Sequence, residues 1–310
     1  MRKVCLDQVH LLARRDPRVV FIGSDLGTGI IEGMRREFPE RYYMDGIYEA
    51  NIIGMAAGLA MDGYIPYVNT IATFLTRRAF EQIALDLCLH RLPVRLIGNG
   101  GGVVYAPLGP THLAVDDFAL MRVLPNMTVL AVCDAEEMRR LMLQTLDWPD
   151  PIYIRLAKGG DEVVSREEHG FKIGQAIVMR SAAVTAPLFV STGVMTTNAL
   201  AAARLLAAGG VECTVLHFHT IKPLDVAALL EHAALAKAIF TVEEHTLVGG
   251  FGSAILEALT DKLTAIPPVK RLGLSDAFAS HYGNQNDLFE VNGLLPAQIA
   301  ETALQFLNRL

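Results

Sequence analysis

The sequence predicts an α/β protein of two domains, each built on a mainly parallel sheet. Three observations predict this fold class. Short apolar runs rich in β-branched residues alternate with segments of helical periodicity along the chain. The chain has 310 residues, 52% of them hydrophobic, which is enough for two domains with a large core. A polar stretch at 159–170 has little apolar periodicity, so we interpret it as the linker between domains at 1–160 and 170–310.

The first block begins with an amphipathic helix within residues 1–18, followed by buried strands. Each strand is a short apolar run that ends near a glycine or a polar residue. The predicted strands are 19–24, 42–46, 65–70, 94–101, 127–134 and 151–159. Helices are predicted from Glu49, over 75–90 and over 135–146, the last with Asp134 as its N-cap.

The second block repeats this alternation. Its predicted strands are 182–193, 211–223, 238–245 and 268–276. Three predicted helices separate these strands, the first of them ending at Gly209. A terminal helix follows the last strand. Strands separated by helices of 10–15 residues imply parallel pairing with right-handed crossovers.

The composition excludes several functions. The net charge is −6 without a basic run, so neither nucleic acid nor an anionic membrane is an expected partner. No stretch reaches about 18 uninterrupted apolar residues, so no transmembrane helix is predicted.

The four cysteines form no CxxC pair, which indicates reduced cysteines in a cytoplasmic protein. No His/Cys cluster has metal-site spacing, so no metal ligand is predicted here. Sparse charge indicates a surface partly covered by another chain.

Polar and aromatic residues follow the strands of the first block, where ligands bind in open parallel sheets. Taken singly, an aspartate after a strand caps a turn, an aromatic fills the core, and a lone histidine is rarely catalytic. The glycine-rich loop matches neither the P-loop nor the dinucleotide motif, so no nucleotide site is predicted. The residues at this edge are Asp25, Leu26, Glu49, Phe74, the loop 98–102 and His112.

Glu49 is the least ordinary of these residues, because it starts an almost wholly apolar helix in the stretch MDGIYEANIIGMAAGLA. No cation lies within a helical turn of it in the sequence. Gly54 and Gly58 lie on one face, where another helix could approach closely, so we expect a subunit contact. Such a contact would exclude water from Glu49 and favour it as a proton donor to a ring nitrogen.

Five segments resemble the transketolase family. GIYEANIIGMAAGLA is similar to the family's glutamate segment, and ATFLTRRAFEQI to the aromatic segment that follows it. The family's GPTH segment, together with the strand that follows it, is similar to GPTHLAVDDFALMRVLPNMTVLAVCDA. VEEHTLVGGFGSAI and DAFASHYGNQNDL resemble the family's C-terminal domain. The resemblance covers nearly the whole chain, in order and at family spacing.

The resemblance implies a thiamine-diphosphate enzyme that transfers a two-carbon ketol unit from a ketose to an aldose. Family members have three domains, and this chain resembles the second, pyrimidine-binding domain and the third. It has nothing like the magnesium motif of the first domain. The resemblance therefore implies the C-terminal subunit of a split transketolase. A separate N-terminal subunit would bind the diphosphate and Mg²⁺ in an α2β2 heterotetramer in which this chain dimerises.

The resemblance also implies roles for single residues near the cofactor. Glu49 would hydrogen-bond N1′ of the pyrimidine, and Phe74 would stack on that ring. Arg77 and Phe80 would complete this wall. His112 would contact the substrate oxygens as a donor or proton shuttle. The residues matching the family's Asp-Leu pair near the cofactor are Asp25 and Leu26.

The sugar-phosphate site departs from the family. Leu108 stands where some members have an aspartate that contacts sugar hydroxyls, and Gly100 falls near a phosphate-binding histidine. Lys158 aligns with a phosphate-binding arginine, with Arg155 close by, and Arg2 matches another phosphate contact. Lysine lacks the bidentate geometry of arginine. We therefore expect an unusual substrate, such as a modified or branched sugar, and weak pentose-phosphate activity.

Three alternatives remain open. The β subunit of a 2-oxo-acid dehydrogenase has the same two domains and glutamate, but a different histidine loop. A deoxyxylulose-phosphate synthase-like carboligase has an IR-x-x-R segment that Arg155 resembles. A non-catalytic assembly or regulatory module belongs to another class, and loss of Glu49 or His112 would favour it.

Overall fold

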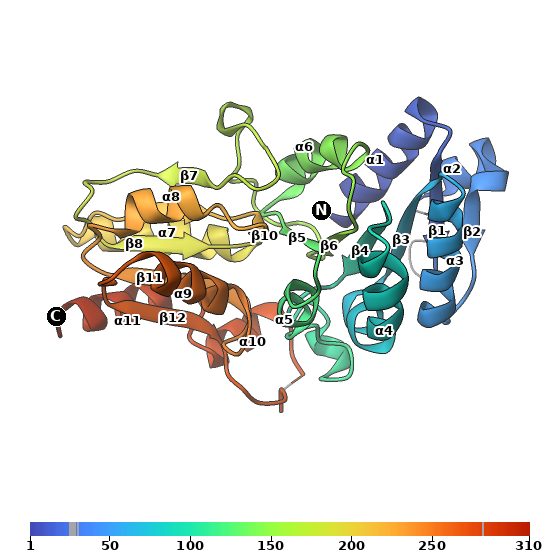
Figure 1. Cartoon of the computed structure of the whole chain (residues 1–310). Coiled ribbons are helices and arrows are strands. Elements are labelled where there is room, and N and C mark those ends of the chain that lie inside the picture. Colours follow the sequence, from blue (N-terminus) through green and yellow to red (C-terminus); the bar gives the residue numbers. More distant parts are fainter. Residues whose placement is uncertain (25–28, 30, 281) are drawn as a thin grey trace.

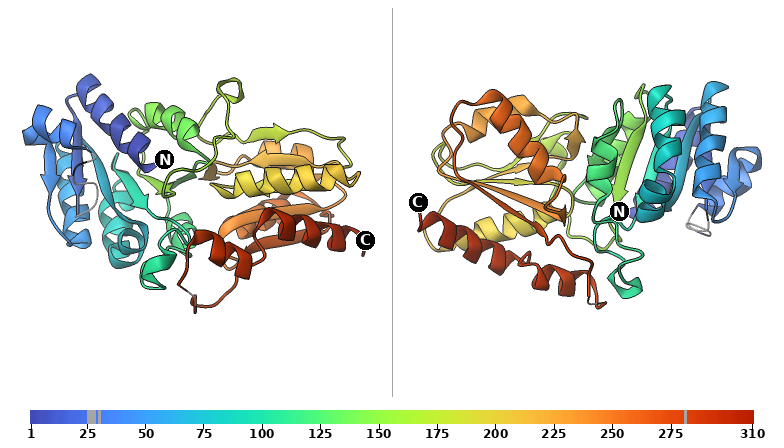
Figure 2. Two further views of the ribbon diagram at one scale, coloured as in Figure 1. Left: turned by 180° about the vertical axis from the view of Figure 1, so that it is seen from behind. Right: turned by 60° about the horizontal axis from the view of Figure 1, so that its bottom comes forward.

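The computed structural model describes residues 1–24, 29, 31–280 and 282–310. Two α/β units lie side by side, each built on its own sheet (Figure 1). The predicted fold class, α/β with mainly parallel sheets, is therefore confirmed. The N-terminus lies in the middle of the molecule, beside the junction of the two units, whereas the C-terminus lies at the far end of the second, as both views of Figure 2 show.

The first unit is built on a seven-stranded sheet with the order β10-β5-β6-β4-β3-β1-β2. Its first six strands along the chain pair in parallel, as the alternation of strands and helices predicted. Their bounds are β1 (Val19–Gly23), β2 (Tyr42–Met44), β3 (Ile65–Ile71), β4 (Arg95–Asn99), β5 (Thr128–Ala131) and β6 (Ile152–Leu156).

The seventh strand comes from the second block. The strand predicted over 211–223 is broken into β9 (Thr214–His217) and β10 (Thr220–Lys222). Strand β9 stays in the second sheet, whereas β10 crosses to the first unit and pairs antiparallel with β5. The two units therefore share backbone hydrogen bonds as well as side-chain contacts.

Helices cover both faces of the seven-stranded sheet. On one face, α1 (Arg2–Arg15) and α6 (Ala135–Thr145) contribute to the same hydrophobic core. A second hydrophobic core includes residues of α3 (Glu49–Met61) and α5 (Asp117–Arg122). The short elements of this unit are α2 (Glu32–Glu37), η1 (Pro39–Arg41) and η4 (Ala106–Leu108).

The helix predicted over 75–90 is not a regular α-helix. Two π-helical segments, η2 (Phe74–Arg78) and η3 (Ile83–Leu89), flank the short α4 (Phe80–Gln82). Ile83 and Leu87 are nevertheless buried. π-Helical turns are rare and frequently mark functional sites.

The second unit has a five-stranded sheet with the order β12-β11-β8-β9-β7. Strand β7 pairs antiparallel at the edge and was not predicted, because it is short and follows the polar linker. Helices lie on both faces of this sheet (Figure 1). The remaining bounds are η5 (Glu167–His169), β7 (Ile177–Arg180), β8 (Leu188–Ser191), α7 (Met195–Ala208), α8 (Val226–Ala233), β11 (Ile239–Thr246), α9 (Phe251–Lys262), β12 (Val269–Leu274), α10 (Gln285–Val291) and α11 (Pro296–Leu307).

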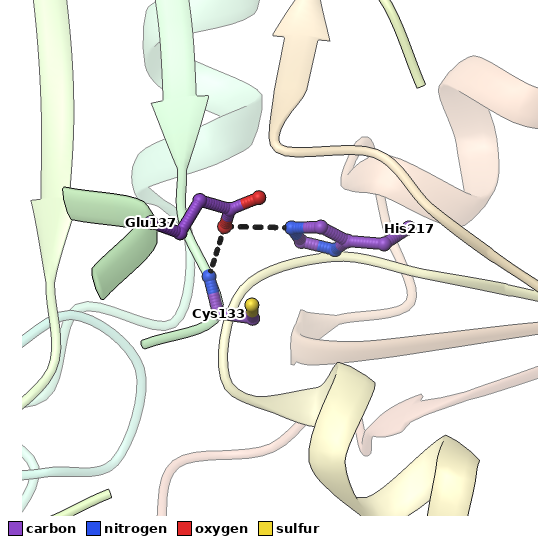
Figure 3. Close-up of side chains that lie close together, drawn as sticks. All are labelled: Cys133, Glu137 and His217. Atoms are coloured by element: carbon purple, nitrogen blue, oxygen red, sulfur yellow. Dashed lines mark hydrogen bonds and ion pairs between the residues drawn. The ribbon is translucent and has the colours of Figure 1, made fainter. Parts of the chain in front are cut away.

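The two units join through a buried polar contact. Glu137, on α6, accepts a hydrogen bond of 2.9 Å from Nε2 of His217, on β9, and a second from the backbone N–H of Cys133 (Figure 3). Asp134 caps α6, as predicted, by accepting from the backbone N–H groups of residues 136 and 137. Its carboxylate also accepts from Ser165 in the linker, so one cap fastens both helix and linker.

The register of the first sheet aligns the carboxyl ends of four of its strands, β1, β3, β4 and β6. Gly23 pairs with Asn69, and Asn99 pairs with both Ile71 and Leu156. The loops after β1, β3, β4 and β6 therefore leave the sheet at one edge. Among the described residues, no helix is long and apolar enough to span a membrane.

Candidate active site

Glu49 begins α3 at the carboxyl edge of the first sheet. Its side chain is 1% exposed, and its Oε2 accepts a hydrogen bond of 2.9 Å from Nη1 of Arg78. As the sequence indicated, the residues within one helical turn of Glu49 supply no cation. The fold instead brings Arg78 to it from 29 positions along the chain, an ion pair that the sequence reasoning missed.

The burial of Glu49 has a different cause from the one expected. From the sequence we expected a subunit contact over Gly54 and Gly58 to exclude water from it. Both glycines are exposed, and a Cβ atom on either would meet nothing within 4 Å. Glu49 is instead buried by its own chain, because η2 packs against α3.

An aromatic side chain and a histidine meet beside this ion pair. Phe74 follows β3, and its ring centroid lies 5.1 Å from that of His112, with the ring planes inclined at 63°. Cζ of Arg78 lies over the Phe74 ring, 4.2 Å from its centroid. The structure thus brings Glu49 and His112 together through these two side chains, although they are far apart in the sequence.

His112 makes a side-chain hydrogen bond through one of its two ring nitrogens. Its Nδ1 lies 2.9 Å from Oγ1 of Thr111, which fixes the orientation of the ring. In the part of the chain that the structure describes, Nε2 makes no hydrogen bond.

Arg77 and Phe80 make contacts of their own near this group. Arg77 donates from Nε to Asp116 at 2.8 Å and lines a cavity of about 130 Å³ between the His112 loop and the second unit. Phe80 is half-buried and packs against the hydrophobic core. Neither contacts Glu49 through a hydrogen bond or ion pair among the described residues.

A buried polar network lies at the same edge and was not singled out in the sequence. Nδ2 of Asn99 donates to Oδ1 of Asn69 at 2.7 Å and to the carbonyl of Thr70 at 3.0 Å. The hydroxyl of Thr70 lies 2.9 Å from that of Ser24. Polar residues at the ends of otherwise apolar strands were the signal that could have identified this network.

The glycine-rich loop after β4 serves the junction of the two units. Gly102 has φ +64°, and a Cβ there would lie 2.2 Å from Cδ of Glu244. Oε1 of Glu244 accepts hydrogen bonds from the backbone N–H of Val103 and from Gln285, each at 2.8 Å. Burial raises the pKa of Glu244 to about 7. The loop therefore needs glycine for close packing against this carboxyl group.

Arg155 is buried at the same junction. Its guanidinium donates to both oxygens of Asp117, at 2.7 and 2.9 Å, and to the carbonyls of Ala114 and Glu244. Its Cζ also lies 3.9 Å from the ring centroid of Phe118. A phosphate contact would require Arg155 to give up these partners, and that contact stays a prediction from the resemblance.

The two remaining predicted cations, Lys158 and Arg2, follow residues that contact each other, Ala157 after β6 and Met1 before α1. Lys158 is exposed, and Arg2 is half-buried at the start of α1. The sulfur of Met1 accepts a hydrogen bond from the backbone N–H of Ala157, which holds the two segments together. Asp25 and Leu26 lie outside the described residues.

The chain matches two family models. The transketolase pyrimidine-binding domain matches residues 1–160, and the transketolase C-terminal domain matches residues 175–299. A subunit of the apulose-4-phosphate transketolase of Phocaeicola vulgatus is 32% identical over 99% of this chain and 97% of its own length. The 6-deoxy-6-sulfo-D-fructose transketolase subunit of Clostridium sp. (strain MSTE9) is 33% identical over 100% and 95%.

Longer enzymes match as well. The 1-deoxy-D-xylulose-5-phosphate synthase of Synechococcus sp. (strain WH7803) is 37% identical over 96% of this chain, but the chain spans only 46% of that enzyme. A split-gene transketolase, solved as an inactive β4 tetramer, has a TM-score of 0.90 at 33% identity, covering 99% of this chain and 98% of that one. The two family models together span most of the chain, and it therefore belongs to the transketolase family.

Proposed function

We propose that this chain is the C-terminal subunit of a two-subunit, thiamine-diphosphate-dependent transketolase that transfers a ketol unit from a ketose to an aldose. The grouping of Glu49, Phe74 and His112 at one edge of the sheet carries the proposal. The similarity to two split transketolase subunits supports it, because each aligns with this chain over nearly its whole length.

The donor set suits the pyrimidine end of the cofactor. Glu49 offers a buried carboxylate to a ring nitrogen, and Phe74 offers an aromatic face to the ring. When bound, thiamine diphosphate supplies a carbon nucleophile that takes up and passes on the two-carbon unit. Glu49 would hold a proton at the ring nitrogen, and Nε2 of His112 would donate to a substrate oxygen.

The diphosphate and Mg²⁺ are assigned to the partner. Within the described residues, the one group of three His, Cys, Asp or Glu side chains close enough to share an ion is Cys133, Glu137 and His217. This group is buried at the junction of the units, and its nitrogen and sulfur atoms do not suit Mg²⁺, which prefers oxygen ligands. We therefore propose an N-terminal partner subunit in an α2β2 assembly.

An apolar surface on the first unit supports a partner. Several large apolar side chains are exposed on or before α3 and on the neighbouring η3, around the uncovered Gly54 and Gly58. Exposed apolar area of this kind is typical of a subunit contact. The side chains are those of Ile47, Tyr48, Met61, Leu85 and Leu89.

We also propose a cytoplasmic enzyme with an unusual ketose. All four cysteines are free, which fits a reducing compartment. Leu108 is 51% exposed on η4, beside the His112 loop, where it offers no hydrogen bond to a sugar hydroxyl. Lys158 and Arg2 remain the cations proposed for an anionic substrate end, and Arg77 and Phe80 remain proposed parts of the cofactor wall.

The test is reconstitution with the partner subunit, thiamine diphosphate and Mg²⁺, followed by a screen of ketose and aldose substrates. Glu49→Gln should lower kcat by at least about 100-fold with an unchanged circular-dichroism spectrum. Glu212→Gln, which alters an exposed carboxylate paired with Arg180, is the matched control. Full activity of the Glu49 variant, or tight cofactor binding and turnover by this chain without a partner, would contradict the proposal.

One observation favours a second candidate, a carboligase of the deoxyxylulose-phosphate synthase type. The 37% identity to such a synthase exceeds the 32% and 33% identity to the two split subunits. Release of carbon dioxide from pyruvate by the reconstituted enzyme would identify this reaction, because ketol transfer between sugars releases none.

A further inference from the structure

We propose that Arg78 occupies the place of the cofactor's pyrimidine ring in the cofactor-free subunit, and that it withdraws when the cofactor binds. This inference rests on the proposed function. Nη1 of Arg78 lies 2.9 Å from Oε2 of Glu49, and its Cζ lies 4.2 Å from the ring centroid of Phe74. These are the two side chains proposed above to hold the pyrimidine.

A guanidinium group can replace an aromatic heterocycle at such a site. It is planar, it donates hydrogen bonds in its plane, and its face stacks on an aromatic ring. Arg78 makes both contacts at once, one to the carboxylate of Glu49 and one to the face of Phe74. A pyrimidine bound between the same two groups would need the same space, so the two occupants exclude each other.

The exposure of the two partners shows which one moves. The side chain of Glu49 is 1% exposed, whereas that of Arg78 is 47% exposed. Arg78 can therefore withdraw into water by rotating its side chain, while Glu49 stays buried. A buried carboxylate without a partner is strongly unfavourable. Withdrawal of Arg78 is consequently coupled to the arrival of a ring nitrogen that replaces it.

Arg78 has few other attachments. Among the residues that the structure describes, its only hydrogen bond goes to Glu49. Its neighbour Arg77 is paired with Asp116, and Arg155 uses its guanidinium on several partners, so neither is equally free to move. Arg78 is also the last residue of η2, where regular helical hydrogen bonding ends.

The test measures cofactor binding to the assembled two-subunit enzyme by titration calorimetry, with thiamine diphosphate and Mg²⁺ as the probe. If Arg78 must leave, Arg78→Ala removes that requirement and should lower the Kd for the cofactor by about tenfold. The same variant should lower the melting temperature of this subunit alone, because Glu49 loses its partner. Arg14→Ala is the control, since Arg14 is 51% exposed and pairs with Glu37 on another face.

A double-mutant cycle separates displacement from an unrelated effect of the substitution. In a Glu49→Gln background the ion pair is already lost, so Arg78→Ala should then change the Kd by less than about twofold. An unchanged or raised Kd for Arg78→Ala in the wild-type background would overturn the inference, and a raised Kd would identify Arg78 as a group that holds the cofactor. A wild-type assembly that binds no thiamine diphosphate would instead overturn the proposed function, and this inference with it.

Discussion

The carboxylate of Glu137, on a helix of the first unit, lies 2.9 Å from Nε2 of His217, on a strand of the second, and neither side chain is exposed. Burial alone would raise the pKa of Glu137, but His217, through its charge and its hydrogen bond, lowers that pKa to about 2. The junction of the two units therefore depends on an ionised carboxylate that water does not reach.

The first prediction concerns acid stability. The pKa of Glu137 is lower in the folded chain than its ordinary value of 4.5, so its contribution is present above pH 4.5 and is lost as the pH falls towards 2. The contribution is on the order of 3 kcal/mol. Urea unfolding of wild type and Glu137→Gln at several pH values measures it. The two curves should differ at pH 6 and converge near pH 2; a difference that is constant with pH would contradict the assignment.

The second prediction concerns Arg155. If its role is to join the two units, Arg155→Met should lower the free energy of unfolding by about 3–5 kcal/mol, because the buried Asp117 loses its cationic partner and keeps only the hydrogen bond from Tyr153. Arg139→Met, which breaks an exposed pair with Glu136, should change it by less than about 1 kcal/mol. Urea denaturation checks both. An Arg155 variant with wild-type stability but a raised KM would instead support the predicted phosphate-binding role.

The third prediction concerns the exposed face of α3. Gly58→Ala adds a methyl group in open space within a helix, so it should stabilise the isolated subunit by about 0.5–1 kcal/mol. If this face packs closely against another subunit, the same methyl group should weaken assembly. Thermal denaturation and sedimentation measure the two effects. Unchanged association would place the subunit contact elsewhere.

The fourth prediction concerns substrate choice. Leu108→Asp restores a carboxylate beside the His112 loop, and it should raise kcat/KM for xylulose 5-phosphate with ribose 5-phosphate by about tenfold or more, through new hydrogen bonds to sugar hydroxyls. Leu235→Asp, at a leucine that is 65% exposed in the second unit, is the control. A wild-type enzyme that already uses this pair best would show that Leu108 does not set the specificity.

The sequence by itself determined the α/β class, the six parallel strands of the first unit and the Asp134 cap, because apolar periodicity and capping act over a few residues. It also placed Glu49, Phe74 and His112 at one edge of the first sheet, since residues after parallel strands share one edge. The tertiary structure alone decided that β10 crosses between the sheets, that Arg78 pairs with Glu49 and that Arg155 is buried. Each of these contacts joins residues far apart in the chain, and the packing that brings them together has no local signal.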